Sequence, residues 1–197
     1  MSTLIVTAHP DTGSLTHHAA ARLQERLGAG AVIRHLAQEG FDPRFGADDR
    51  ATYRAEAPST PEIAAEQQRI DAVSDLVLVF PVYWWSMPAL LKGWIDRVFV
   101  AGWAFGLEGE RITGMLDRLT VHLLPVSGTT EEAFARHGYT QSFSTQIEHG
   151  ILDYCGARRG ITAFVWNSEA GDDERVAAEV EAAVASIAAG ITTENRS

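Results

Sequence analysis

Short apolar runs alternate with segments of helical periodicity along the chain, and this alternation predicts the fold. Five runs are typical of buried strands: residues 4–8, 31–36, 76–80, 118–126 and 160–166. Five segments carry a helical pattern: residues 15–27, 62–73, 89–100, 143–155 and 172–188. Repeated strand–helix alternation favours an α/β fold in which helices cover both faces of a five-stranded parallel sheet.

The rest of the chain adds little secondary structure to this scheme. Residues 37–61 are polar, aromatic and irregular, which predicts a long surface loop, and loops of that length tend to be functional. We find no internal repeat and no linker, so a single domain is expected over residues 1–191. Residues 192–197 are expected to form a frayed tail.

Composition and charge exclude several classes of partner. Of the 197 residues 46% are apolar and 21% charged, and the net charge of −10 opposes binding to nucleic acid or to an anionic membrane. The longest apolar stretch, residues 98–105, is too short for membrane insertion. Because Cys155 is the only cysteine and the N-terminus lacks signal-peptide features, we expect a cytoplasmic protein.

Ligands of such sheets bind beyond the carboxyl ends of the strands, which places a candidate site in three loops: residues 9–16, 81–87 and 127–139. The first loop precedes a helix whose N-terminus could hold a phosphate. Its candidate phosphate ligands are His9, Ser14 and Thr16, whose side chains carry hydrogen-bond donors. The alternative is an ordinary capped helix with an exposed histidine.

The second loop contains three consecutive aromatic residues, which need either a core or a planar ligand to cover them. We expect this loop to contact a planar cofactor through Pro81, Val82, Tyr83, Trp84 and Trp85. A dimer interface is the alternative, since tryptophan and tyrosine are enriched there too. In the third loop, the small residues Ser127, Gly128 and Thr129 would let a ligand approach the backbone.

Rival chemistries are poorly supported. His17 and His18 are neighbours on a helix, so their side chains diverge and cannot share a metal ion; we predict no metal site. Ser127 lacks the glycine-flanked context of a hydrolase nucleophile, and Cys155 lies in a helical stretch typical of a buried small residue. A hydrolase is therefore disfavoured.

These motifs together resemble a known family. Ala8-His9-Pro10 with Ser14-Leu15-Thr16, residues 65–68, and above all the long segment from Phe80 to Phe99 are similar to the NAD(P)H:quinone oxidoreductase family of flavodoxin-like proteins. Residues 102–106 and 149–156 resemble it too, and the likeness runs from about residue 3 to 166. The family includes vertebrate quinone reductases, bacterial modulators of drug activity and ancillary subunits of potassium efflux systems.

The resemblance implies a flavodoxin-like sheet of strand order 2-1-3-4-5 and a homodimer that binds FAD or FMN at the three loops named above. It also adds Leu15 to His9, Ser14 and Thr16 as a residue of the flavin-phosphate segment. It also implies that Trp103 and Phe105 line the substrate pocket of a partner subunit. The family's Thr-Thr-Gly-Gly loop is replaced here by Ser127-Gly128-Thr129, in which only the small, hydroxyl-bearing character is kept.

Vertebrate members of the family place a tyrosine and a histidine after the fourth strand, and the resemblance implies that these relay a proton during hydride transfer. Here Phe134 stands at the tyrosine position, which makes it a candidate substrate contact, and Thr140 stands near the histidine position. Tyr139 and His137 lie close by in the sequence and are the candidate catalytic residues.

The implied function is two-electron reduction of a quinone-like acceptor by NAD(P)H through flavin, with donor and acceptor using one pocket in turn by a ping-pong mechanism. Two alternatives remain: a regulatory flavoprotein subunit that binds a membrane transporter, and a flavodoxin-like electron carrier. The efflux subunits lack much of the segment 41–61, which favours the free-standing reductase. The sequence does not separate FAD from FMN or NADH from NADPH.

Overall fold

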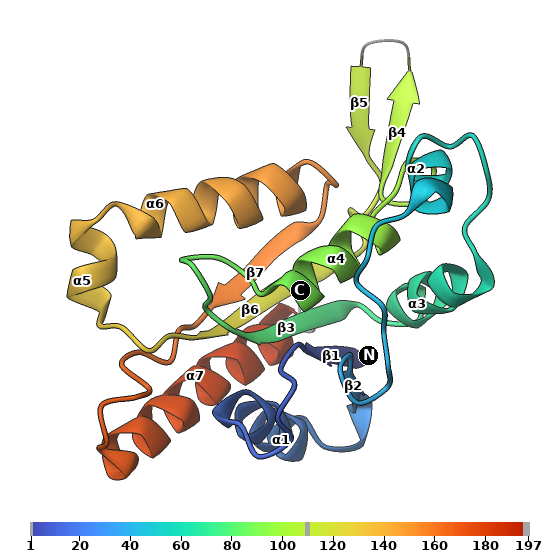
Figure 1. Cartoon of the computed structure of the whole chain (residues 1–197). Coiled ribbons are helices and arrows are strands. Elements are labelled where there is room, and N and C mark those ends of the chain that lie inside the picture. The colour runs from blue at the N-terminus through green and yellow to red at the C-terminus, as the bar shows by residue number, and fades with distance from the viewer. Residues whose placement is uncertain (1, 109–110, 195–197) are drawn as a thin grey trace.

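The computed structural model describes residues 2–108 and 111–194, and its centre is a parallel sheet (Figure 1). Five strands form it: β1 (Thr3–Thr7), β2 (Ala31–His35), β3 (Asp75–Pro81), β6 (Thr120–Val126) and β7 (Arg158–Thr162). Their order is β2-β1-β3-β6-β7 and every neighbouring pair is parallel. This is the predicted order 2-1-3-4-5 once the two strands of a separate hairpin are set aside, so the predicted fold is confirmed.

Helices cover both faces of the sheet, as the strand pattern requires. Helices α1 (Leu15–Leu27) and α7 (Asp173–Glu194) pack on one face, against Ile5, Val77 and Val79. Helices α3 (Pro61–Asp71), α4 (Ala89–Val98), α6 (Tyr139–Phe143) and η2 (Ser144–Asp153) belong to the other side, where Leu4, Leu76 and Leu78 are buried. Every residue of β3 and β6 is buried, because these central strands have a helical layer on each side.

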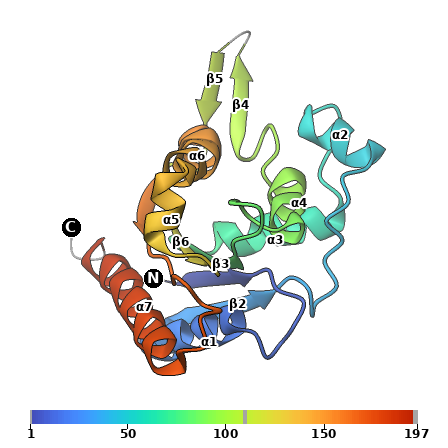
Figure 2. The same ribbon diagram turned by 60° about the vertical axis from the view of Figure 1, so that its left-hand side comes forward.

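A small hairpin was not predicted from the sequence. Strand β4 (Phe105–Glu108) pairs antiparallel with β5 (Arg111–Gly114), and the hairpin projects from the body of the domain (Figures 1 and 2). Its strands have four residues each, and β5 is mostly exposed, so no buried apolar run announces it. At its base Gly114 lies against the backbone of Gly156, where a Cβ atom would have no room.

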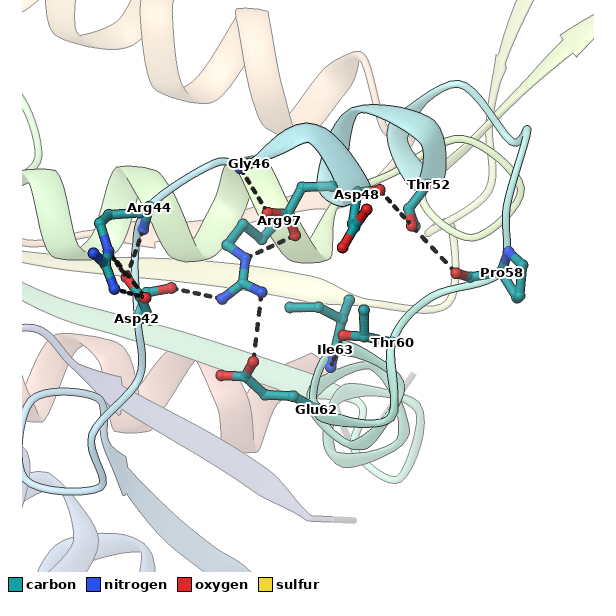
Figure 3. Close-up of polar contacts among 11 residues, drawn as sticks. Asp42, Arg44, Gly46, Asp48, Thr52, Pro58, Thr60, Glu62, Ile63 and Arg97 are labelled. Atoms are coloured by element: carbon teal, nitrogen blue, oxygen red, sulfur yellow. Dashed lines mark hydrogen bonds and ion pairs between the residues drawn. The ribbon is translucent and has the colours of Figure 1, made fainter.

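The segment 37–61 is more structured than the predicted loop. It contains helix α2 (Ala47–Tyr53), and Arg97 of α4 fastens it to the domain (Figure 3). The guanidinium of Arg97 donates to Asp49 Oδ1 at 2.8 Å and to the backbone oxygen of Asp42 at 2.6 Å, and it pairs with Glu62 at 3.4 Å. The expectation of an irregular loop was therefore wrong for α2, whose short, charged sequence shows no apolar periodicity.

The C-terminal third also differs in detail from the prediction. Helix α5 (Glu131–Arg136) lies inside the segment expected to be a loop, and the helix predicted for residues 143–155 begins earlier, as α6, and continues in π-helical form as η2. Helix α7 extends to Glu194, beyond the predicted start of the tail, and residues 195–197 lie outside the described residues. Across the described part of the chain, no helix is long and apolar enough to cross a membrane.

Candidate functional site

The three predicted loops meet at one edge of the sheet because they follow three adjacent parallel strands, β1, β3 and β6. Backbone hydrogen bonds continue past the strand ends and hold the loops together. The N–H of Ala8 donates to Val79 at 3.2 Å, and the N–H of Val82 donates to Val126 at 2.8 Å. The three loops therefore lie side by side at one edge of the sheet, which is the arrangement that the predicted site requires.

The loop between β1 and α1 presents hydrogen-bond donors. Ser14 caps α1, and the N–H groups of Leu15 and Thr16 have no partner within the helix, as is general for a first helical turn. The Nδ1 atom of His9 accepts a hydrogen bond from the N–H of Asp11 at 3.0 Å, so a neutral His9 carries its proton on Nε2. This loop offers a positive helix end and several donors, as an anion site requires.

The loop after β3 is a two-residue turn with strained backbone. The N–H of Tyr83 donates to Ser86, the N–H of Ser86 donates back, and the two residues between them, Trp84 and Trp85, have φ of 49° and 65°. Such turns favour asparagine and glycine, because the left-handed region costs about 1–2 kcal/mol for other residues. Two tryptophans in this geometry, one of them 90% exposed, indicate a functional constraint on the turn.

Aromatic rings stack beside this turn. The rings of Trp85 and Tyr139 are parallel with centroids 4.0 Å apart, and His137 stacks near Tyr139 at 5.6 Å. The candidate catalytic residues Tyr139 and His137 therefore lie beside the second loop. In the sequence, the short helix α5 stands between them and β6. Phe134 packs edge-on beneath Trp85 and Tyr139 and is 0% exposed. Its ring supports the stack from below and presents no surface to a substrate in this structure, unlike the expectation.

The loop after β6 is held by the segment that follows β7. The Oγ atom of Ser127, a buried residue, accepts from the N–H of Thr129 at 3.3 Å. The N–H of Ser168 donates to the carbonyl of Ser127, and the N–H of Asn167 donates to that of Thr129, both at 2.9 Å. A Cβ atom on Gly128 would lie 3.1 Å from the carboxyl carbon of Glu169, so a larger residue there would require a small shift of that exposed side chain.

Residues 166–169 are thus part of the site, and our sequence analysis did not include them. Arg175 of α7 fixes this segment by donating to the carbonyls of Trp166 and Asn167, while Glu179 accepts from the N–H of Trp166 at 2.7 Å. Asn167 has a φ of 51°, and asparagine tolerates that region better than most residues. That asparagine was the only signal in the sequence.

Trp103 and Phe105 lie away from the three loops. The indole N–H of Trp103 donates to the Asp71 carboxylate, and Arg118 lies over the ring while pairing with the same carboxylate. Phe105 is nearly buried and lines a separate hollow with Tyr154. Within one chain these two residues do not join the candidate site, which agrees with their expected role in the site of a partner subunit without testing it.

Other reactive groups are unsuited to catalysis. Burial raises the pKa of the Cys155 thiol to about 11, so a thiolate nucleophile is disfavoured at neutral pH. Over the residues that the structure describes, no cluster of three or more histidine, cysteine, aspartate or glutamate side chains could hold a metal ion.

Comparison with known proteins agrees with this geometry. The model of a family described as having a flavodoxin-like fold matches residues 1–189. The ribosyldihydronicotinamide dehydrogenase [quinone] of Mus musculus is 30% identical over 177 residues, with 78% of this chain and 76% of the relative covered.

Two solved structures show the same fold. The NAD(P)H:quinone oxidoreductase from Methanothermobacter marburgensis has a TM-score of 0.84 at 23% identity, covering 93% of this chain and 95% of that one. An FMN-dependent NADH-azoreductase from Bacillus anthracis str. Ames Ancestor, in complex with FMN, has a TM-score of 0.74 at 17% identity, covering 96% and 98%.

Proposed function

Because the chain belongs to the flavodoxin-like quinone oxidoreductase family, we propose that it reduces quinones or similar small acceptors with electrons from NAD(P)H by way of a bound flavin. The observation that carries the proposal is the meeting of a phosphate-type helix end, a strained tryptophan turn and a small-residue loop at one sheet edge. A cytoplasmic location belongs to the same proposal.

The residues present fit a flavin. Its phosphate suits the donors of the β1–α1 loop, namely the Nε2–H of His9 and the first N–H groups of α1. Its ring suits the turn at Trp84 and Trp85, where strain holds two aromatic side chains at a sheet edge. Gly128 has no side chain of its own, which suits close approach of a planar ligand to the backbone of this loop. FAD and FMN share all of these contacts.

A flavin bound there supplies hydride transfer in both directions, so one pocket can serve donor and acceptor in turn by a ping-pong mechanism. The protein's part is to orient the ligands and to manage protons. Tyr139 is the candidate proton donor, because its ring is fixed against Trp85 and so its hydroxyl is held beside the second loop. His137, an exposed residue whose ring lies 5.6 Å from that of Tyr139, is positioned to exchange that proton with solvent.

We also propose that the protein forms a homodimer, and one surface of the domain has the features of a dimer interface. A row of aromatic rings runs from Phe45 through Tyr53 and Phe105 to Tyr154, with successive centroids 6.3, 5.8 and 5.2 Å apart. Two hollows of about 590 and 310 Å³ adjoin it and share Tyr53 and Asp96. Three of the four rings are at least 39% exposed, which is unusual for a free surface.

Charge on the same surface favours a second copy as its occupant. The larger hollow is lined by Arg50 and Arg54 of the segment around α2 and by Asp96 of α4. Opposite charges on one patch are self-complementary across a twofold axis, because each copy offers both signs to the other. Sedimentation of the parent chain and of Tyr53→Arg tests this: a dimer that the variant abolishes is expected, and a monomeric parent would contradict it.

The enzymatic proposal is tested by spectroscopy. The purified protein should be yellow or should take up FMN or FAD, and the chromophore released by heat identifies which of the two it holds. Under argon, NADH, NADPH or dihydronicotinamide riboside should bleach it, and a benzoquinone should restore the colour. The third donor is included because of the name of the mouse relative.

Each failure has a separate meaning. A protein that binds neither flavin contradicts the central claim and leaves the tryptophan turn as an interface. A yellow protein that no dihydronicotinamide bleaches contradicts the reductase function. The two alternatives, a regulatory flavoprotein and an electron carrier, are then favoured. Initial rates over a grid of both substrates should give parallel double-reciprocal lines, and intersecting lines would exclude the ping-pong mechanism.

A further inference from the structure

His17, on the first turn of α1, is hydrogen-bonded through both ring nitrogens. Its Nδ1 lies 2.9 Å from the Oγ atom of Ser14, and its Nε2 lies 3.1 Å from the Oε1 atom of Gln38. Only 9% of the residue is exposed. Ser14 is the cap of α1 and a predicted phosphate ligand, so His17 contacts the β1–α1 loop through this residue.

Gln38 determines where the proton of a neutral His17 resides. The amide nitrogen of Gln38 faces the backbone carbonyls of His9 and Pro10, at 3.5 and 3.4 Å, so its oxygen must face His17. An oxygen in that position can only accept, so Nε2 of His17 carries the hydrogen. Nδ1 is then an acceptor, and the hydroxyl hydrogen of Ser14 must point towards it.

This arrangement is unfavourable for binding a phosphate. With its hydrogen directed at His17, the Oγ atom of Ser14 has only a lone pair left for a ligand, and a lone pair repels a phosphate oxygen. If His17 gains a proton, Nδ1–H becomes the donor to Ser14. The serine hydroxyl is then released and can donate to the phosphate, and the imidazolium adds a positive charge near it.

The groups around His17 permit this change. The ring of His35 in β2 lies 4.7 Å away and tilted, and its Nδ1 lies 2.7 Å from the Thr7 hydroxyl. Burial, followed by the charge of His17, lowers the pKa of His35 below its ordinary value, so His35 does not compete for the proton. His9 lies at 6.3 Å on the β1 side.

The other ionisable groups in these elements are exposed or have partners of their own. On α1 the neighbouring ring is that of His18, which lies on the exposed face of the helix. After β2, Glu39 accepts a hydrogen bond from the backbone N–H of His35 and pairs with Arg34. In the β1–α1 loop, Asp11 accepts a hydrogen bond from the N–H of Gly13. A cavity of about 520 Å³ reaches both Ser14 and His17, which gives solvent a route to the ring.

We propose that His17 is a positioning residue for the cofactor phosphate: binding of the phosphate at the N-terminus of α1 draws a proton onto His17, which turns the Ser14 hydroxyl towards the ligand. This rests on the proposed function, since it requires the flavin phosphate to lie at that helix end. Cofactor binding is then coupled to proton uptake, and the affinity rises as pH falls.

Titration calorimetry of the flavin-free protein tests the coupling directly. FMN is titrated at pH 7.5 in two buffers of different ionisation enthalpy, because the difference in heat counts the protons taken up. Phosphate monoesters already carry about two charges at this pH, so an uptake must occur on the protein. We expect net proton uptake with FMN and none with riboflavin, which lacks the phosphate.

Affinity measured over pH 6.5 to 8.5 by quenching of flavin fluorescence gives a second readout. If one proton is taken up with the phosphate, the dissociation constant of FMN should rise with pH, by up to about tenfold per pH unit. His17→Gln should abolish both the uptake and this slope. His18→Gln removes an imidazole from the same turn of α1 and should keep both.

The outcomes separate this inference from the proposed function. If FMN binds with equal heats in both buffers, the coupling is wrong while the flavoprotein proposal stands. If riboflavin causes the same uptake as FMN, the proton does not belong to the phosphate and the inference is also wrong. If neither FMN nor FAD binds, the proposed function itself fails. The measurements on the parent protein decide these cases even if the variant does not fold.

Discussion

The ring of Trp85 lies against the ring of Tyr139, with centroids 4.0 Å apart and planes 9° from parallel. The two residues are far apart in sequence and come from different loops, the turn after β3 and the start of α6. The stack connects the predicted flavin wall to the predicted proton donor. Because Trp85 has a positive φ, its ring direction depends on a backbone that most residues avoid.

Tyr139→Phe separates the two roles of this tyrosine, since phenylalanine keeps the stack and loses the hydroxyl. We expect unchanged folding and flavin binding, and a fall of roughly 100-fold in the rate of the step that needs the proton, measured by rapid mixing. Equal rates for Tyr139→Phe and the parent would exclude Tyr139 as the donor.

Trp84→Gly tests the strain in the tryptophan turn. Because Trp84 is almost fully exposed and has a φ of 49°, glycine should raise the free energy of unfolding by about 1 kcal/mol and weaken flavin binding. Denaturant titration of the flavin-free protein and flavin titration measure the two effects. Ala55→Gly also relieves a positive φ, of 57°, and as a control should stabilise the protein with no change in flavin affinity. Stabilisation without weaker binding at Trp84 would show that its strain serves no ligand.

The parallel sheet was predictable because its strands are continuous apolar runs, such as residues 76–80. Such a run indicates a strand covered on both faces, and every residue of β3 is buried. The meeting of the three loops followed from topology alone, because adjacent parallel strands end at one edge. The stack of Trp85 on Tyr139 could not be predicted in this way. It depends on the side-chain directions of a strained turn and a short helix, and neither has a periodic pattern.

Helix α2 and the hairpin were missed for a related physical reason. α2 is short and charged, and its place is fixed by Arg97 from a helix that lies some fifty residues further along the chain. The segment at Asn167 joins the site only because it pairs with the loop after β6. Long-range polar contacts of this kind leave no local signal in a single sequence.

Arg97→Met tests whether the ion-pair network of Figure 3 holds the segment 37–61 in place. The Arg97 side chain is 10% exposed and donates to Asp49, Glu62 and the carbonyl of Asp42, so its loss leaves the buried Asp49 carboxylate without its ion-pair partner. We expect a loss of about 3–5 kcal/mol in the free energy of unfolding and faster proteolysis within the segment. Lys92→Met removes an exposed pair with Asp96 on the same helix and should cost less than about 1 kcal/mol. Similar losses in both variants would contradict an anchoring role for Arg97.

The last prediction concerns acid stability and a buried pair that connects the adjacent strands β3 and β6. Nε2 of His122 lies 3.3 Å from Asp75 Oδ1, while Nδ1 of His122 accepts from the N–H of Ile161 at 3.0 Å. Burial acts to raise the pKa of Asp75, but hydrogen bonds from His122 and Ser74 outweigh it, and the pKa lies below its ordinary value. The unfolded chain therefore binds a proton at a higher pH than the folded chain does. The stability that Asp75 contributes is present above the ordinary carboxyl range and is lost as pH falls through the folded pKa.

Asp75→Asn should remove that acid dependence. At pH 7 we expect a loss of about 1–3 kcal/mol in the free energy of unfolding, because one of two buried acceptors is gone. Below about pH 4 the parent should lose stability faster than the variant, so that the two curves converge. Denaturant titrations across pH 3 to 7 measure this, with Asp117→Asn, at an exposed position, as the control that keeps the parent's slope. Parallel curves for Asp75→Asn and the parent would mean that the acid sensitivity arises from other carboxylates, whereas convergence assigns it to the pair that joins β3 to β6.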